Sequence, residues 1–486
     1  MFNCIAVDMG AASIRIMVGT IENNIISYKE ISRFKNEIKL IHGHERWDVE
    51  YIITEINKAI NEIITRDDIQ ISGIGVDSWG VDFVLLDKNG DLLDTPVAYR
   101  DSRTRSMQQK WETIMSREET FRRTGINFYQ FNTLFQLLAI RDERFMQNVT
   151  SILFMPCYIS YRLSGRVFNE LSIASTSQLL NVDNNEMNNE ILKCLNLEST
   201  QFGKILIPGE IAGNVTEGHC LPGSVKMIAV CCHDTASAVL AVPSDSMRYA
   251  FISTGTWCLA GLVSDKPVLD AFALKNGFTN ERGYGNSYRI LKNIIGLWLI
   301  QGLQSSFGNK YSYDEIEELV SKTENQKIII PDNEIFYNPV DMKEAFDQFL
   351  RQSGQILPGT PGEYFRIAYD SLCCSFRENI DKLETMLHVS IETVHLIGGG
   401  SRSEYLCRQT ENICRRKVIA GPVEGSTIGN ILVQAIALKA IKSIEEGRKL
   451  VKNSFEIVEY IPEGSDVETD KIYKLYKKIS KLLPSV

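Results

Sequence analysis

The sequence lacks the short motifs that mark several large enzyme classes. It contains no G-x-x-x-x-G-K-[ST] phosphate loop, no G-x-G-x-x-G turn, no H-E-x-x-H helix and no G-x-S-x-G elbow. P-loop kinases, Rossmann dehydrogenases, zinc peptidases and α/β-hydrolases therefore lose most of their support. The 11 cysteines include no C-x-x-C pair, so the spacing typical of a zinc site or a disulfide framework is missing as well. We expect buried thiols in a reducing, cytoplasmic environment.

Long apolar runs and an excess of basic charge are also missing. The longest apolar runs, such as residues 294–300, fall far short of the roughly 20 residues that cross a membrane. The first residues form an apolar run without a basic stretch or a cleavage site, so we expect no signal peptide. With 52 basic and 61 acidic side chains the formal charge is −9, which opposes nucleic-acid binding. Near the C-terminus, residues 471–483 combine helical apolar spacing with lysines; we expect this helix to pack on the protein, with membrane contact as the alternative.

Short apolar segments that end at a polar or glycine-containing turn recur along the chain. Residues 4–7 and 14–18 predict a β-hairpin, and a similar hairpin is predicted about 245 residues later, around residues 253–256. Predicted strands alternate with predicted helices elsewhere, which is typical of the α/β class. Because the chain has 486 residues, we expect two related domains, residues 1–243 and 244–486, with a junction near residues 243–247.

Three of these turns suit phosphate or nucleotide binding. In residues 8–15, small side chains let backbone N–H groups approach an anion, and Ser13 and Arg15 add a donor and a fixed cation. Asp8 at the strand end could hold Mg²⁺ through water. Residues 253–257 are similarly small and hydroxylated, and three glycines at 398–400 could support a flat nucleoside. The alternative for each is an ordinary tight turn.

Two further segments suit a sugar and a proton acceptor. Phosphoryl transfer to an alcohol uses a carboxylate that accepts the hydroxyl proton, and Asp234 follows a predicted strand. The alternative for Asp234 is a helix cap, and His233 could orient it or bind a sugar hydroxyl. Residues 77–83 offer carboxylates, an indole ring and a glycine, a combination that suits sugar binding, although Trp79 could equally belong to the core.

These motifs occur in the same order as in the FGGY family of carbohydrate kinases. Together with eight longer stretches, they make the chain resemble that family across residues 1–440. The stretches are VDSWGVDFVLLD (76–87), PVAYRDSRT (96–104), FNTLFQL (131–137), MPCYISYRLSG (155–165), HDTASAV (233–239), STGTWCL (253–259), LKNIIGLWLIQ (291–301) and AGPVEGSTIGN (420–430). The resemblance implies two actin-like, ribonuclease-H-like domains with a catalytic cleft between them. It also implies that the first domain binds mainly the sugar and the second mainly ATP.

The resemblance implies ATP-dependent phosphorylation of the 1-hydroxyl of L-rhamnulose with Mg²⁺, with another ketose, L-fuculose or L-xylulose, as the alternative substrate. Asp234 matches the proton acceptor of the family, and Asp8 matches its metal-side aspartate. The matches to nucleotide-binding positions are Ala11, Ala12, Ser13, Ile14, Arg15, Thr256, Gln301 and Gly399. The matches to substrate-binding positions are Gly80, His233, Thr235 and Asn293.

The sequence departs from the family pattern in a few places. Ala12 removes one possible hydroxyl donor from the first turn, and Cys157 and Arg282 stand where an aspartate and a glycine are usual. None of these changes removes the proposed base. A function of another class, an ATP-dependent regulator or scaffold, is the alternative that actin-like folds leave open. The residues give no indication of the oligomeric state.

Overall fold

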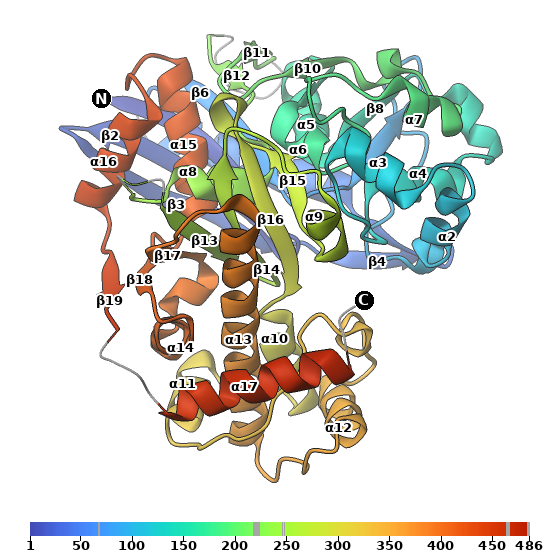
Figure 1. Ribbon diagram of the computed structural model, residues 1–486. Coiled ribbons are helices and arrows are strands. Elements are labelled where there is room, and N and C mark those ends of the chain that lie inside the picture. The colour runs from blue at the N-terminus through green and yellow to red at the C-terminus, as the bar shows by residue number, and fades with distance from the viewer. Residues whose placement is uncertain (67–68, 217–223, 245, 247, 463–466, 484–486) are drawn as a thin grey trace. The chain divides into compact units, whose positions relative to one another are not determined.

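The computed structural model describes residues 1–66, 69–216, 224–244, 246, 248–462 and 467–483 (Figure 1). It divides into two compact units. Unit 1 comprises Met1–Pro243, Val263–Ile290 and Gly425–Ser454; unit 2 comprises Ser244–Leu262, Leu291–Glu424 and Phe455–Val486. The junction expected at residues 243–247 includes positions 245 and 247, which lie outside the described residues. Both units combine a sheet with packed helices, as expected for the α/β class.

The central sheet of unit 1 has the strand order β11-β12-β6-β1-β2-β3. β1 pairs with β2 as the antiparallel hairpin predicted from the sequence, and it pairs in parallel with β6. β6 in turn pairs in parallel with β12. The strands are β1 (Phe2–Met9), β2 (Ser13–Glu22), β3 (Ile25–Lys35), β6 (Gly73–Ser78), β11 (Ile211–Asn214) and β12 (Lys226–Ile228).

The two faces of this sheet are built differently. On one face, apolar side chains of β1 such as Ile5 join Ile56 of α1 (Val49–Arg66) in a fully buried core. On the other face, glycines allow α15 (Gly425–Ala437) to approach closely: a Cβ at Gly19 would lie 2.5 Å from the Ile431 side chain. α8 (Asp234–Leu240) packs beside α15 on this face (Figure 1). The ends of β1 and β6 are therefore covered by α8 and α15.

Further short elements complete unit 1. Its other helices are α2 (Met107–Glu112), α3 (Arg117–Thr124), α4 (Thr133–Ile140), α5 (Met155–Ser164), α6 (Leu171–Ser175), α7 (Asn189–Cys194), α9 (Ala271–Lys275) and α16 (Ile444–Ser454). Its other strands are β4 (Ile38–Ile41), β5 (His44–Trp47), β7 (Phe83–Leu86), β8 (Ser151–Phe154), β9 (Phe168–Glu170), β10 (Lys204–Leu206) and β15 (Thr279–Arg282).

The sheet of unit 2 repeats the connectivity of unit 1. β13 pairs antiparallel with β14 and parallel with β17, and β17 pairs in parallel with β18. This order, β14-β13-β17-β18, corresponds to β2-β1-β6-β12 in unit 1, as the recurrence of the hairpin motif suggested. The strands are β13 (Tyr249–Thr254), β14 (Trp257–Ser264), β16 (Tyr288–Ile295), β17 (Thr393–Gly398), β18 (Lys417–Ala420) and β19 (Val458–Tyr460).

Helices of unit 2 include the basic C-terminal helix. α17 packs on α13 and α14, as Figure 1 shows for α13, and Lys477 Nζ lies 2.7 Å from Glu378 Oε1. The expected packing on the protein is thus confirmed. None of the described helices has an apolar stretch long enough to cross a membrane. The helices are α10 (Trp298–Ser306), α11 (Tyr313–Ser321), α12 (Met342–Gln352), α13 (Pro361–Leu387), α14 (Glu404–Cys414) and α17 (Val467–Leu482).

Candidate active site

Neighbouring strand ends in unit 1 bring three carboxylates to one edge of the sheet. Asp8 and Asp77 are paired residues of β1 and β6. Beyond β6, Ser78 N donates to Cys232 O at 2.8 Å, which places the start of α8 beside the same strand end. Because carboxyl ends of parallel strands meet at one edge, Asp234 joins the two other aspartates there, and the charges of all three influence one another.

Asp8 is buried, and both of its carboxylate oxygens accept hydrogen bonds. Its Oδ1 accepts from Arg15 Nη2 at 2.9 Å, and its Oδ2 accepts from Ser426 Oγ at 2.6 Å and Thr427 Oγ1 at 2.8 Å. Asp8 and Arg15 were predicted to bind a metal and an anion from the same turn, whereas no role was predicted for Ser426 or Thr427. Both lie in the stretch 420–430 that carried the family resemblance, and that stretch was the one available signal. The start of α15 thus fixes the carboxylate at the end of β1.

Asp77 is fully buried, and only one of its two carboxyl oxygens has a hydrogen-bond partner in the described part of the chain. Its Oδ2 accepts from Asn430 Nδ2 at 2.6 Å, whereas Oδ1 has no hydrogen-bond partner in the described part of the chain. Burial and the neighbouring charge of Asp8 raise the pKa of Asp77 well above its ordinary value. A carboxyl oxygen without a partner beside another carboxylate is a site of excess negative potential, which a cation would relieve.

Asp234 is the first residue of α8, and its side chain is 33% exposed. Its Oδ1 accepts a hydrogen bond from Thr235 Oγ1 at 3.1 Å. Burial raises the pKa of Asp234, the neighbouring His233 lowers it, and the charge of Asp8 raises it. A carboxylate with a raised pKa is a stronger proton acceptor. Asp234 is thus the first residue of α8, whereas the cap position, the alternative stated for Asp234, is held by His233; the carboxylate is accessible.

The structure brings the proposed substrate residues of unit 1 together. His233 Nε2 lies 3.5 Å from Asp234 Oδ1, and a Cβ at Gly80 would lie 3.5 Å from the same nitrogen. Thr235 is joined to Asp234 by the hydrogen bond described above. Gly80, His233, Asp234 and Thr235 therefore form one local cluster, and a Cβ at position 80 would be in van der Waals contact with the imidazole.

The loop that carries Gly80 is strained and firmly held. Val81 has a φ of 70°, which is rare for a β-branched residue and costs about 1–3 kcal/mol. Its carbonyl accepts from Thr133 Oγ1 at 2.6 Å, and its N–H donates to Thr176 Oγ1 at 3.2 Å. These bonds hold the backbone beside His233 in a conformation that the chain would otherwise avoid.

Asp82, in the same loop, accepts hydrogen bonds from side chains of the core. Its Oδ2 accepts from Trp47 Nε1 at 2.6 Å and Trp79 Nε1 at 2.9 Å, and its Oδ1 accepts from Gln136 Nε2 at 3.1 Å. The residue is 1% exposed, and burial raises the pKa of Asp82 to about 6. Trp79 is therefore a core residue anchored by Asp82, which was the alternative stated for it.

The first hairpin turn spans the proposed phosphate-binding residues 11–15. Gly10 N donates to Ser13 O at 3.0 Å, which closes a tight turn with Ala12 exposed. Ile14 is fully buried, so only its backbone could meet a phosphate. The guanidinium of Arg15 is bound to Asp8. The turn therefore offers mainly backbone N–H groups and the Ser13 hydroxyl to an anion.

In unit 2, the glycine turn packs against the end of β13. Gly400 N donates to Thr254 Oγ1 at 3.0 Å. A Cβ at Gly398, whose φ is 87°, would lie 2.7 Å from Thr254 O, whereas one at Gly399 would meet no described atom within 4 Å. Gly398 is therefore required by the close approach and the positive φ, while Gly399 presents a bare backbone to its surroundings.

The other proposed residues of unit 2 lie around the β13–β14 turn and the strand that precedes α10. Thr256 O accepts from Gly296 N and Trp298 N, both at 3.2 Å, which joins the turn to the start of α10. Gln301 lies one turn into that helix and is half-buried. Asn293 lies on β16 and is also half-buried. The structure thus places Thr256 beside the helix that carries Gln301.

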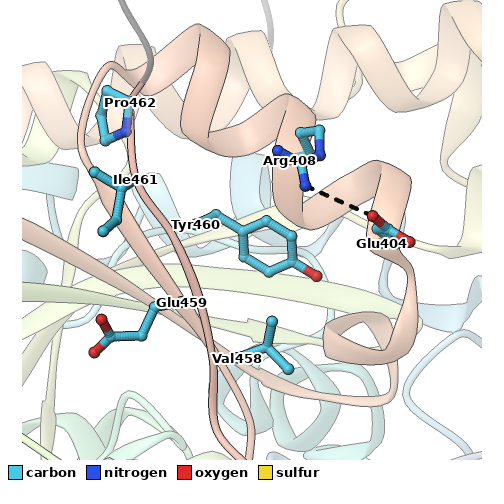
Figure 2. A pocket seen from close by; sticks show the side chains of 7 residues that line it. All are labelled: Glu404, Arg408, Val458, Glu459, Tyr460, Ile461 and Pro462. Atoms are coloured by element: carbon cyan, nitrogen blue, oxygen red, sulfur yellow. Dashed lines mark ion pairs between the residues drawn. The ribbon is translucent and has the colours of Figure 1, made fainter.

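A separate open pocket of about 700 Å³ lies on unit 2 between α14 and β19 (Figure 2). Arg408 lies 3.6 Å from Glu404 and 5.4 Å above the ring centre of Tyr460. Both charged side chains are more than half exposed. The pocket contains none of the residues proposed from the sequence, and its ion pair is an ordinary solvated one.

Comparisons with known proteins show the family of this chain. Residues 3–241 match the N-terminal domain of the FGGY family of carbohydrate kinases, and residues 250–438 match its C-terminal domain. A rhamnulokinase from Ligilactobacillus salivarius is 36% identical over 94% of this chain and 95% of its own length. Rhamnulokinases from Bacillus subtilis and Bacteroides thetaiotaomicron are each 37% identical, covering 96% and 95% of this chain and 96% of their own lengths.

Solved structures share the fold at low sequence identity. A ligand-bound xylulose kinase from Lactobacillus acidophilus has a TM-score of 0.82 at 15% identity, with 99% of this chain and 98% of that one covered. A glycerol kinase from Plasmodium falciparum, solved with ADP, has a TM-score of 0.80 at 14% identity over 100% and 98% of the two chains. The expected two-domain α/β fold is confirmed by these matches.

Proposed function

This chain belongs to the FGGY family of carbohydrate kinases, and from that membership we infer that it transfers the γ-phosphoryl group of ATP to the 1-hydroxyl of L-rhamnulose. The products are L-rhamnulose 1-phosphate and ADP, in the breakdown of L-rhamnose. The rhamnulokinases that match nearly the whole chain support this substrate. One structural observation carries the proposal: Asp234, accessible and with a raised pKa, lies beside His233 and Gly80 at the strand ends of unit 1.

In the proposed mechanism, Asp234 accepts the proton of the 1-hydroxyl. The hydroxyl oxygen forms a bond to the γ-phosphorus as the bond from phosphorus to the ADP oxygen breaks in line. Because the transition state of phosphoryl transfer is loose, positioning and charge neutralisation supply most of the acceleration. Asp234 therefore contributes mainly by removing a proton that would otherwise leave the sugar oxygen cationic, a state from which the phosphoryl group would readily return to ADP.

We assign the remaining residues by ligand. Gly80, His233, Thr235 and Asn293 bind the sugar. The residues assigned to ATP are Ala11, Ala12, Ser13, Ile14, Arg15, Thr256, Gln301 and Gly399. The backbone turn at residues 11–15 and the bare backbone at Gly399 support these roles. We further propose that the part built on residues 1–243 binds mainly the sugar and that built on 244–486 mainly ATP, in the cytoplasm where ATP is available.

Magnesium fits the aspartates of unit 1. Asp8 would hold the ion, and the unpartnered Oδ1 of Asp77 leaves negative potential nearby. The described residues contain no group of three or more His, Cys, Asp or Glu that could hold a metal by themselves. This agrees with Mg²⁺, which commonly keeps water ligands and uses one or two carboxylates together with substrate phosphates. When bound, the ion neutralises phosphate charge.

Substrate choice tests the proposal directly. With ATP and Mg²⁺ in a coupled ADP assay, we expect kcat/KM for L-rhamnulose to exceed that for L-fuculose and L-xylulose at least about tenfold, since a site that hydrogen-bonds specific hydroxyls rejects isomers that misplace them. Product NMR should place the phosphate on the 1-oxygen. Higher kcat/KM for either other ketose would replace the substrate assignment, and ATP hydrolysis independent of any sugar would favour the regulator alternative.

The pH profile tests the base. Only ionised Asp234 can accept a proton, and its pKa is raised, so kcat/KM should fall as the pH drops through that pKa, at a higher pH than the ordinary Asp value of about 3.9. The profile is measured with L-rhamnulose at saturating ATP. Enzyme returned from each pH to neutral buffer must regain full activity, which separates titration from unfolding. A rate that stays constant down to about pH 4 would contradict the assignment.

A further inference from the structure

Three charged or titratable side chains face the two ring nitrogens of His233. Nδ1 lies 3.0 Å from Arg289 Nη2 and 3.1 Å from Glu281 Oε2. Nε2 lies 3.5 Å from Asp234 Oδ1. The side chains of Arg289 and Glu281 are only 1% and 6% exposed, so the Nδ1 side of the ring is almost free of solvent. The sequence analysis did not single out Arg289 or Glu281, and nothing in their local sequence connects them with His233.

Arg289 determines which ring nitrogen can carry the proton. A guanidinium has N–H donors and no acceptor, so its hydrogen bond to Nδ1 requires a lone pair on that nitrogen. The proton of the neutral ring is then on Nε2. A proton on Nδ1 could donate to Glu281 Oε2 at 3.1 Å, but it would also face the guanidinium N–H of Arg289 at 3.0 Å. Arg289 is itself fixed: Nη2 lies 2.9 Å from Glu281 Oε2 and donates to Arg282 O at 3.2 Å. The carboxylate of Glu281 balances the charge of Arg289, which makes burial of the pair tolerable.

The backbone on the other side of the ring is also fixed. Cys232 N donates to Glu170 Oε2 at 2.9 Å, and His233 N donates to Ser172 Oγ at 3.1 Å. Ser172 Oγ in turn donates to the same oxygen of Glu170 at 2.7 Å. With the backbone held by Glu170 and Ser172 and Nδ1 held by Arg289, the remaining nitrogen of His233 keeps one direction, toward Asp234.

We propose that Arg289 holds His233 as the neutral tautomer protonated on Nε2, so that this N–H faces the carboxylate of Asp234. The inference rests on the proposed role of Asp234 as the proton acceptor. A neutral donor steadies the ionised carboxylate without delivering a proton to it, and it sets the direction of the carboxylate plane. The opposite tautomer would turn a lone pair toward an anion. Arg289 and Glu281 are accordingly positioning residues, which act through His233.

The tautomer is measurable in the wild-type enzyme without any turnover. The chain has six histidines, so selective ¹⁵N-histidine labelling gives few signals, and His233→Gln identifies those of His233 by their loss. In the free enzyme at neutral pH, long-range ¹H–¹⁵N spectra should show Nε2 protonated and Nδ1 unprotonated. Protonation of Nδ1, in the other tautomer or in an imidazolium, would overturn the inference. The expected tautomer in an enzyme inactive on every ketose would instead refute the proposed function.

A pair of substitutions tests the consequence for catalysis. The amide of His233→Gln reaches the position of Nε2 and can donate there, whereas the shorter amide of His233→Asn reaches only the position of Nδ1. We expect kcat of the Gln variant to exceed that of the Asn variant at least about tenfold, with KM for ATP equal within about twofold. Equal kcat values, or a faster Asn variant, would show that the Nε2 donor is unimportant.

The positioning role of Arg289 needs a variant that spares the fold. Arg289→Met alone leaves the Glu281 charge buried without a partner, so it is combined with Glu281→Leu, which offers Nδ1 no donor. This double variant should keep KM for ATP, lose about 10- to 100-fold in kcat, and lose the fixed Nε2–H signal of His233. Arg289→Lys, which keeps a donor and the charge, should recover part of kcat. A double variant with wild-type kcat and an altered His233 tautomer would overturn the link between tautomer and rate.

Discussion

Replacing Asp234 with asparagine is expected to lower kcat about 10²- to 10⁴-fold while leaving the affinity for ATP within about threefold. Asparagine has nearly the same shape and can keep the hydrogen bond to Thr235, but it cannot accept the hydroxyl proton. The loss falls on the chemical step because the proposal gives Asp234 the hydroxyl proton and assigns ATP to other residues. A coupled ADP assay gives kcat, and calorimetric titration with ATP gives the affinity.

The matched control for this prediction is another aspartate of the same unit. Asp142 is 66% exposed and pairs with Arg141 on the surface, so Asp142→Asn removes the same charge far from the proposed base. We expect wild-type kcat from it, since surface ion pairs contribute little. If Asp234→Asn kept more than about a tenth of wild-type kcat with its fold intact, another group would have to be the proton acceptor.

Gly429→Ala should produce the largest loss of stability among single-methyl changes near the site. A Cβ at position 429 would lie 1.9 Å from the carbonyl oxygen of Ser237, so α15 and α8 could not keep their present separation. The obstacle is backbone, which no rotamer change can move. Overpacking of this kind costs about 1–3 kcal/mol, or roughly 2–9 °C in the melting temperature. Thermal unfolding followed by circular dichroism measures the shift.

Gly425→Ala provides the comparison on the same helix. Its Cβ would lie 3.4 Å from Ala238, an ordinary contact, so we expect its melting temperature to remain within about 2 °C of the wild-type value. Because α8 begins with Asp234, displacement of this helix in the Gly429 variant should also lower kcat. The Gly425 variant should keep its kcat, since its Cβ would not displace α8. Similar melting temperatures for the two variants would show that the helices separate more easily than this packing implies.

The sequence predicted the local parts of this fold well. The hairpins at β1–β2 and β13–β14 follow from apolar runs that stop at small polar turns, a pattern confined to about 20 residues. The recurrence of the hairpin likewise anticipated the repeated strand order. The predicted site residues Gly80, His233, Asp234 and Thr235 lie together in unit 1, and the family resemblance identified them.

Contacts between segments far apart in the chain could not be predicted from the sequence alone. Ser426 and Thr427 reach Asp8 across more than 400 positions, and Arg289 reaches His233 across 56. No periodicity or spacing records such a pairing, because the residues meet only after the sheet and its covering helices have formed. Asp82 shows the converse: its motif suggested a sugar ligand, whereas burial beneath two indole rings makes it an internal acceptor.

The return of α15 to unit 1 has a consequence for synthesis on the ribosome. This helix supplies the donors to Asp8 and Asp77, and Ile431 fills the space left by Gly19. The part of the sheet that α15 covers therefore stays exposed until the nascent polypeptide has grown past residue 437. A gene truncated at the boundary between the two family domains would yield a product that exposes this bare surface and aggregates.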